Sequence, residues 1–201
     1  MRRPEMKPQE LLKAIGSWKW MWATAGGLGH MWPASGTWGS LPPCVMLLGV
    51  QWWGGSLGVM LAVLFGLLAL SSTACIRYGE GVESATGRKD PSVVVIDEVA
   101  GMSLTLLLGL AYLIVFGHPP GHSIVETIQG SVPSSLIAVL TFACFVFFRV
   151  MDVIKPPPAR ALQSIPGGWG ILIDDLVVAP YAAVAAVVCL ETLVRMGPIG
   201  V

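Results

Sequence analysis

Charged residues are segregated along this chain in a pattern that few water-soluble folds could accommodate. No Asp, Glu, Lys or Arg lies between Trp20 and Ile76, and only Glu126 carries a charge between Val99 and Phe148. The chain is 54% hydrophobic and 12% charged, against roughly 25% charged residues in soluble domains. Because too few polar side chains remain to cover a surface in water, the sequence predicts an integral membrane protein rather than a soluble helical one.

Five apolar segments suit membrane helices, and together they predict an all-α, polytopic helical bundle. A helix needs about 20 apolar residues to cross the hydrocarbon layer. The first segment is shorter than that, so it is expected to be short, tilted or re-entrant. The five predicted spans are approximately residues 41–54, 57–76, 99–117, 134–150 and 176–194.

The first 25 residues differ from the rest because they are basic and amphipathic. Their apolar residues include Leu11, Leu12 and Ile15, followed by tryptophans at 18, 20 and 22, a composition typical of helices that lie at the membrane interface. We therefore expect residues 1–25 to form an interfacial N-terminal segment and residues 26–201 to form a single membrane domain. Zero net charge argues against a nucleic-acid partner.

The distribution of Lys and Arg predicts the orientation of the bundle. The N-terminus, loop 77–98 and loop 149–175 hold eleven of the twelve basic residues, whereas turn 54–56 and loop 117–133 hold none. Basic loops remain in the cytoplasm, so we expect the N-terminus inside and the C-terminus outside. This topology places most of the polar residues considered below on the cytoplasmic side.

Five carboxylates lie near the predicted cytoplasmic ends of the spans. They form two adjacent pairs, Asp97-Glu98 and Asp174-Asp175, with Asp152 as the fifth. Neighbouring carboxylates repel each other unless a cation lies between them. Mg²⁺ takes carboxylate oxygens, so the pattern predicts a metal site. The alternative is that these acids are solvated caps at helix N-termini.

Basic and hydroxyl side chains on the same side are candidate phosphate ligands. Arg149 and Lys155 share one predicted helical face with Asp152, and Pro156 is expected to end that helix. Guanidinium and ammonium groups neutralise phosphate oxygens. The alternative is that these cations only orient the protein in the membrane. The candidate phosphate-binding residues are Thr37, Ser40, Arg149, Lys155 and Arg160.

Four sequence blocks, in this order, resemble the phosphatidylglycerophosphatase A family. They are Gly36-Thr37-Trp38-Gly39-Ser40-Leu41, Asp97-Glu98-Val99-Ala100-Gly101-Met102, Phe148-Arg149 through Lys155-Pro156 with Pro158 and Arg160, and Gly168-Trp169-Gly170-Ile171 with Asp174-Asp175. The resemblance implies a Mg²⁺-dependent enzyme of the bacterial inner membrane. It also implies hydrolysis of the phosphomonoester of phosphatidylglycerophosphate, a lipid, to phosphatidylglycerol.

The resemblance gives the candidate residues specific functions in metal-assisted hydrolysis. We expect Asp97, Glu98, Asp174 and Asp175 to hold Mg²⁺, and Asp152 to act as a ligand or a base. A phospholipid-alcohol phosphotransferase is one alternative, but its expected Asp-Gly-x-x-Ala-Arg run is absent from the sequence. A solute or ion transporter is another, and its carboxylates would be expected deep within the spans.

Overall fold

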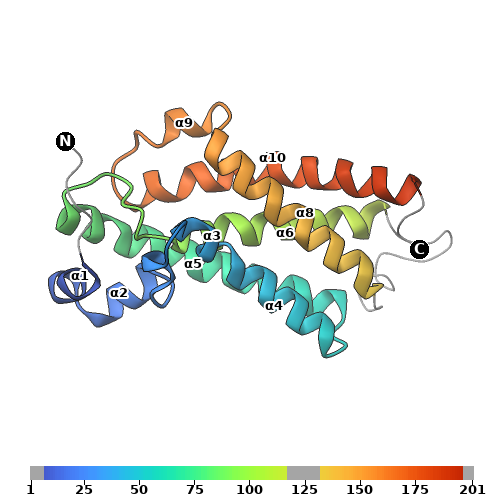
Figure 1. Ribbon diagram of the computed structural model, residues 1–201, viewed down its shortest axis with the longest axis horizontal. Helices are drawn as coiled ribbons and strands as arrows, with labels where there is room; N and C mark the ends of the chain where they lie inside the picture. The colour runs from blue at the N-terminus through green and yellow to red at the C-terminus, as the bar shows by residue number, and fades with distance from the viewer. Residues whose placement is uncertain (1–6, 117–131, 197–201) are drawn as a thin grey trace.

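Every regular element in the described parts of the chain is helical. The computed structural model describes residues 7–116 and 132–196 (Figure 1). The elements are α1 (Pro8–Ile15), α2 (Ser17–Ala23), the 3-10 turn η1 (Leu28–His30), α3 (Ser35–Gly39), α4 (Leu41–Trp52), α5 (Leu57–Thr86), α6 (Ile96–Phe116), α8 (Ser134–Ile154), α9 (Ala159–Leu162) and α10 (Gly168–Arg195).

Four of these helices are long and apolar enough to cross a membrane, namely α5, α6, α8 and α10. They run along the same long axis, and α6 lies at the centre, with 61% of its most apolar stretch buried against 28% to 33% for the other three (Figure 1). Large apolar side chains point outward from the outer helices, including Phe65 (67% exposed) and Phe142 (70%). An apolar exterior suits a lipid environment, so the predicted helical membrane bundle is confirmed.

Helix α4 is the short first segment that the sequence predicted. Its 12 residues span about 18 Å at 1.5 Å per residue, less than the roughly 30 Å of hydrocarbon. It begins with Pro42 and Pro43 in its first turn, where their missing N–H groups leave no helical bond unmade. Helix α4 packs against α5, α6 and α8, so it completes the bundle from one side.

Two long helices extend further than predicted at the end of the bundle that carries the charged residues. Residues 77–86 were expected to form a polar loop, but they continue α5, which ends at the left-handed Gly87 (φ +62°). Helix α10 begins at Gly168 rather than at residue 176. The two extensions cross closely, since a Cβ at Gly79 would lie 3.0 Å from the Cα of Gly168. Packing of these glycines thus stabilises helical turns whose composition is typical of loops.

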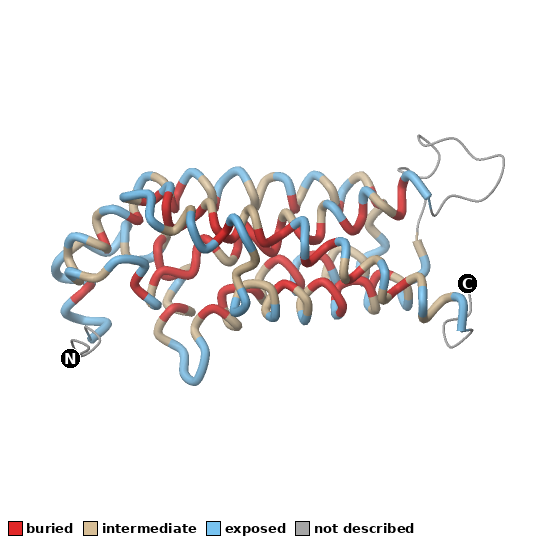
Figure 2. The backbone as a smooth tube through the Cα atoms, turned by 90° about the horizontal axis from the view of Figure 1, so that it is seen from above, coloured by how far each residue is buried: buried red, intermediate tan, exposed pale blue. Residues whose placement is uncertain are grey.

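The N-terminal helices cover the same end of the bundle. Helices α1 and α2 pack against α5, and Leu11 and Ala23 are buried in a cluster with Cys75 and Val82 of that helix. Figure 2 shows buried residues along the inner sides of the long helices and exposed residues on their outer turns. The end nearest the N-terminal helices is therefore enclosed by protein and positions the polar residues described next.

Candidate active site

Three carboxylates from two membrane helices converge at this end of the bundle. Asp97 and Glu98 come from the first turn of α6, and Asp175 comes from α10. One oxygen of each lies within 4.8 Å of the others. Within the described residues, Asp97 Oδ1, Glu98 Oε2 and Asp175 Oδ2 are buried and have no hydrogen-bond partner. Buried carboxylate oxygens without donors are costly, so this cluster fits a hard divalent cation well.

A glycine allows the two helices to approach closely enough to form this cluster. Gly101 lies one turn after Asp97 on α6. A Cβ at this position would lie 2.7 Å from Phe148 Cζ of α8 and 3.0 Å from Asp175 Cβ of α10. The block Asp97-Glu98-Val99-Ala100-Gly101 therefore supplies both the ligand atoms and the space that brings Asp175 to them.

The short helix α3 closes the cluster from a third side. Gly36 lies directly against Glu98 and Arg149, because a Cβ there would overlap Glu98 Oε1 and lie 2.8 Å from a terminal nitrogen of Arg149. The buried hydroxyl of Ser40 donates to the carbonyl of Gly36 at 2.9 Å. It also accepts a hydrogen bond from Arg149 Nη1 at 3.5 Å, so the 36–40 segment helps to hold the guanidinium beside the carboxylates.

Two cations flank the cluster, and both contact Asp152. Arg149 Nη1 lies 2.9 Å from Asp152 Oδ2. Lys155 Nζ lies 2.5 Å from Asp174 Oδ2 and 3.8 Å from Asp152 Oδ1. Helix α8 ends at Ile154, immediately before Lys155 and Pro156, so the predicted end of this helix is confirmed. Arg149 and Asp152 lie on the last turns of α8, whereas Lys155 follows the helix in a left-handed conformation (φ +48°) and is not on the predicted helical face.

Lys155 remains a cation in this setting. Burial lowers the pKa of Lys155, but the hydrogen bond to Asp174 and the charges of Asp174, Asp175 and Asp152 outweigh that effect. Their combined result is a pKa above the ordinary value for lysine. Since Lys155 follows the last residue of α8, its ammonium group is a stable positive charge at the mouth of the bundle.

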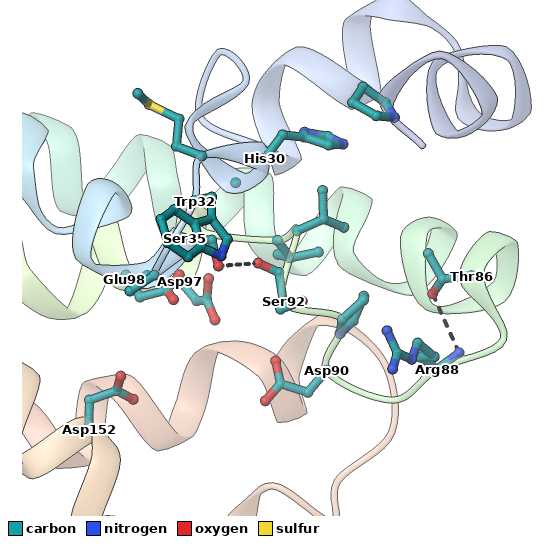
Figure 3. Close-up of a pocket in the computed structure, with 18 of the residues that line it drawn as sticks. His30, Trp32, Ser35, Thr86, Arg88, Asp90, Ser92, Asp97, Glu98 and Asp152 are labelled. Atoms are coloured by element: carbon teal, nitrogen blue, oxygen red, sulfur yellow. Dashed lines mark hydrogen bonds between the residues drawn. The ribbon is translucent and has the colours of Figure 1, made fainter. Parts of the chain in front are cut away.

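These groups line one large cavity of about 1180 Å³. Asp97, Glu98, Asp152 and Asp175 line it together with Arg149 and Lys155. Figure 3 shows the side chains of Asp97 and Glu98 on one wall and Asp152 on the facing wall. The arrangement combines a cation-binding cluster with two fixed positive charges, which is the combination needed to bind and activate a phosphate group.

Comparison with known proteins identifies the family. The family model described as Phosphatidylglycerophosphatase A matches residues 21–190. The chain belongs to this family. As a member of the phosphatidylglycerophosphatase A family, the protein is an enzyme that hydrolyses phosphoric monoesters.

Two curated relatives are similar to this member of the family. Phosphatidylglycerophosphatase A of Haemophilus influenzae is 28% identical over 169 residues, which cover 81% of this chain and 82% of the relative. A Bacteroides thetaiotaomicron protein named "Putative phosphatidylinositol-3-phosphatase" is 28% identical over 117 residues, which cover 58% of each chain. No solved structure matches the chain.

The remaining candidate residues of this family member differ in whether they contact the site. Asp174 and Ser40 contact the two cations, as described above, so both belong to the site. Thr37 lies half-buried in α3, and Arg160 is exposed on α9. Neither residue is among the described residues that line the cavity, so their assignment as phosphate ligands stays a prediction.

Several residues of the cavity wall were not predicted from the sequence, among them Asp90 and Arg88. Asp90 has a left-handed backbone (φ +48°), which Asp tolerates better than most residues. Its Oδ2 accepts a hydrogen bond from Gln163 Nε2 at 3.2 Å, which joins two loops at the mouth of the bundle. The only signal in the sequence was the charged triplet Arg88-Lys89-Asp90 in a predicted cytoplasmic loop, and its spacing did not show which members face the site.

Proposed function

We propose that this protein hydrolyses the phosphomonoester of phosphatidylglycerophosphate and releases phosphatidylglycerol and phosphate. We place the reaction at the cytoplasmic face of the bacterial inner membrane, with Mg²⁺ as the metal. The observation that carries this proposal is the convergence of three carboxylates, two buried and one half-buried, whose oxygens lie within 4.8 Å of one another beside a pair of cations. Family membership supports the reaction class.

The chemistry of the cluster favours Mg²⁺ bound by Asp97, Glu98 and Asp175. Their buried oxygens lack donors in the described structure, and oxygen ligands are those that Mg²⁺ prefers. When bound, Mg²⁺ polarises phosphoryl oxygens and lowers the pKa of a coordinated water molecule. The sequence also predicted Asp174 as a ligand. Its contact with Lys155 favours a different function, which is to hold that ammonium group in position.

Arg149 and Lys155 bind the non-bridging oxygens of the phosphate and neutralise the negative charge that shifts during the reaction. Asp152 lies between the two cations, at 2.9 Å from Arg149 and 3.8 Å from Lys155. It therefore orients both of them, and as a residue of the cavity wall it is also placed to accept a proton from water. Thr37 and Arg160 remain candidate ligands at the edge of the site.

The position of the site in the bundle fits a lipid substrate. The carboxylates lie near the ends of α6 and α10 rather than at their centres, so the diacylglycerol chains can stay in the bilayer while the head group enters the cavity. The basic loops support a cytoplasmic position for this end, with the N-terminus inside and the C-terminus outside. We propose that residues 1–25, which include α1 and α2, lie at the interface around the cavity.

The decisive test is phosphate release from phosphatidylglycerophosphate by the purified protein in detergent. We expect turnover with Mg²⁺, loss of turnover with EDTA, and recovery when Mg²⁺ is added back. The Asp97→Asn protein should remain folded and release almost no phosphate. Turnover that is unchanged in EDTA or in Asp97→Asn would defeat the proposal, and exchange of the head group without phosphate release would indicate a transferase.

A further inference from the structure

The cavity extends well beyond the carboxylate cluster. Its volume of about 1180 Å³ exceeds the roughly 300 to 1,000 Å³ of pockets that enclose a whole small molecule. Figure 3 shows Asp97 and Glu98 toward one end of the cavity and Arg88 with Thr86 toward the other, with Asp90 between them. Under the proposed function the reacting phosphate occupies the first end, so the second end has room for another part of the head group.

The charges along the wall determine what that part can be. The first end is lined by four carboxylates, and its two cations already contact Asp152 and Asp174. Asp90 adds a further carboxylate in the middle of the cavity. A second anionic group of the substrate would be repelled in both places. Arg88 supplies positive charge beyond Asp90, and its planar guanidinium can hold two phosphate oxygens at once.

The backbone directs Arg88 toward the cavity and its neighbour away from it. Helix α5 ends at Thr86, and Gly87 turns the chain through a left-handed conformation. The N–H of Arg88 then donates to Thr86 Oγ1 at 3.4 Å. Arg88 is half-buried and lines the cavity, whereas Lys89 is exposed and is not among the described lining residues. Lys7 also lines the cavity, but it is exposed, and its ammonium group cannot hold two phosphate oxygens in the planar arrangement of a guanidinium.

We propose that Arg88 binds the second phosphate of the substrate, the phosphodiester that links the terminal glycerol phosphate to diacylglycerol. This inference rests on the proposed function and names the feature of the lipid that the site selects. Lipids with two phosphates separated by glycerol engage both ends of the cavity. Lipids with a single phosphate attached directly to diacylglycerol engage only the carboxylate end.

The test compares wild-type protein with Arg88→Ala, Arg88→Lys and the matched control Lys89→Ala on two lipids in the same mixed micelles. The lipids are phosphatidylglycerophosphate, with two phosphates, and phosphatidic acid, with one. We expect Arg88→Ala to lower kcat/KM for phosphatidylglycerophosphate on the order of tenfold or more, mainly through KM, because a charge-assisted hydrogen-bonded pair is lost. Turnover of phosphatidic acid should not change, Arg88→Lys should be intermediate, and Lys89→Ala should match wild type.

Product inhibition gives a second measurement that needs no turnover of phosphatidic acid. Phosphatidylglycerol carries only the diester, so its inhibition should weaken in Arg88→Ala. Inhibition by inorganic phosphate, which occupies only the carboxylate end, should stay the same and show that the site is folded. The inference is overturned if Arg88→Ala has no effect, or if it weakens both lipids and both inhibitors equally. A wild-type protein that releases no phosphate from either lipid would instead refute the proposed function.

Discussion

The two pairs of adjacent acids look alike in the sequence but have different surroundings in the structure. Each pair follows an isoleucine, in Ile96-Asp97-Glu98 and Ile173-Asp174-Asp175. Both acids of the first pair join the carboxylate cluster, whereas only Asp175 of the second pair does so. Asp174 instead contacts Lys155 beyond the end of α8. Two similar motifs therefore contribute unequally to one site.

The cause of this difference is the direction in which neighbouring side chains leave a helix. Successive residues of an α-helix are separated by about 100° around the axis, given 3.6 residues per turn. Near the start of α10, that rotation turns Asp174 toward Lys155 when Asp175 faces α6. In the first turn of α6, the longer side chain of Glu98 reaches the same cluster as Asp97, and Gly36 leaves space for it. Adjacent acids should therefore be tested one at a time.

The largest effect is expected when a member of the cluster loses its charge. Asp97→Asn, Glu98→Gln and Asp175→Asn each remove negative charge from the cation site. Each should reduce phosphate release more than about a hundredfold, because mutation of residues that only support metal ligands already lowers metal affinity or activity by about 10- to 100-fold. Titration with Mg²⁺ should show weaker activation in any protein with residual activity. A variant that keeps wild-type activity and Mg²⁺ dependence would remove that residue from the cluster.

A smaller effect is expected from Asp174→Asn, on the order of tenfold, because Lys155 would lose its closest carboxylate but the cluster would stay intact. The Mg²⁺ concentration for half-activation should not change. Because the pair acts together, Asp174→Asn combined with Lys155→Met should cost less than the sum of the two single changes. A large shift in Mg²⁺ dependence for Asp174→Asn would show that this residue is a metal ligand. It would contradict the conclusion that only Asp175 of the second acid pair belongs to the cluster.

Gly101→Ala tests whether close helix packing assembles the site. The added methyl would overlap Phe148 and Asp175, so the free energy of unfolding should fall by about 1 to 3 kcal/mol. Activity should fall several-fold as α6 and α10 separate. The matched control is Gly66→Ala on α5, where a Cβ would meet nothing within 4 Å. The control should retain full activity, and equal behaviour of the two variants in a thermal unfolding assay would contradict this explanation.

The smallest effect on activity is expected at the opposite end of the bundle. There the hydroxyl of Tyr112 on α6 donates to Glu191 Oε1 on α10 at 2.8 Å. Tyr112→Phe removes this bond and should lower stability by about 1 kcal/mol. Phosphate release should not change, because the pair is remote from the cavity. Loss of activity without loss of stability would show that the far end of α10 influences the position of Asp175.

Much of the fold follows from local properties of the sequence. Long uncharged runs give membrane helices because buried backbone groups must bond within the helix, and Pro156 ends α8 because its ring cannot follow in a helix. The helical extensions at residues 77–86 and at Gly168 were not predicted. They depend on close packing of Gly79 against Gly168, and such packing joins residues that are far apart in the chain.

The sequence by itself determined the membrane class, the family and most of the polar residues near one end of the bundle. Only the tertiary structure decided which of those residues contact one another and which of them face the cavity. It placed Asp175 with Asp97 and Glu98, paired Asp174 with Lys155, and directed Arg88 rather than Lys89 toward the cavity. The physical reason is that composition and motifs set which groups must avoid lipid, whereas the rotation and crossing of the helices set which groups meet.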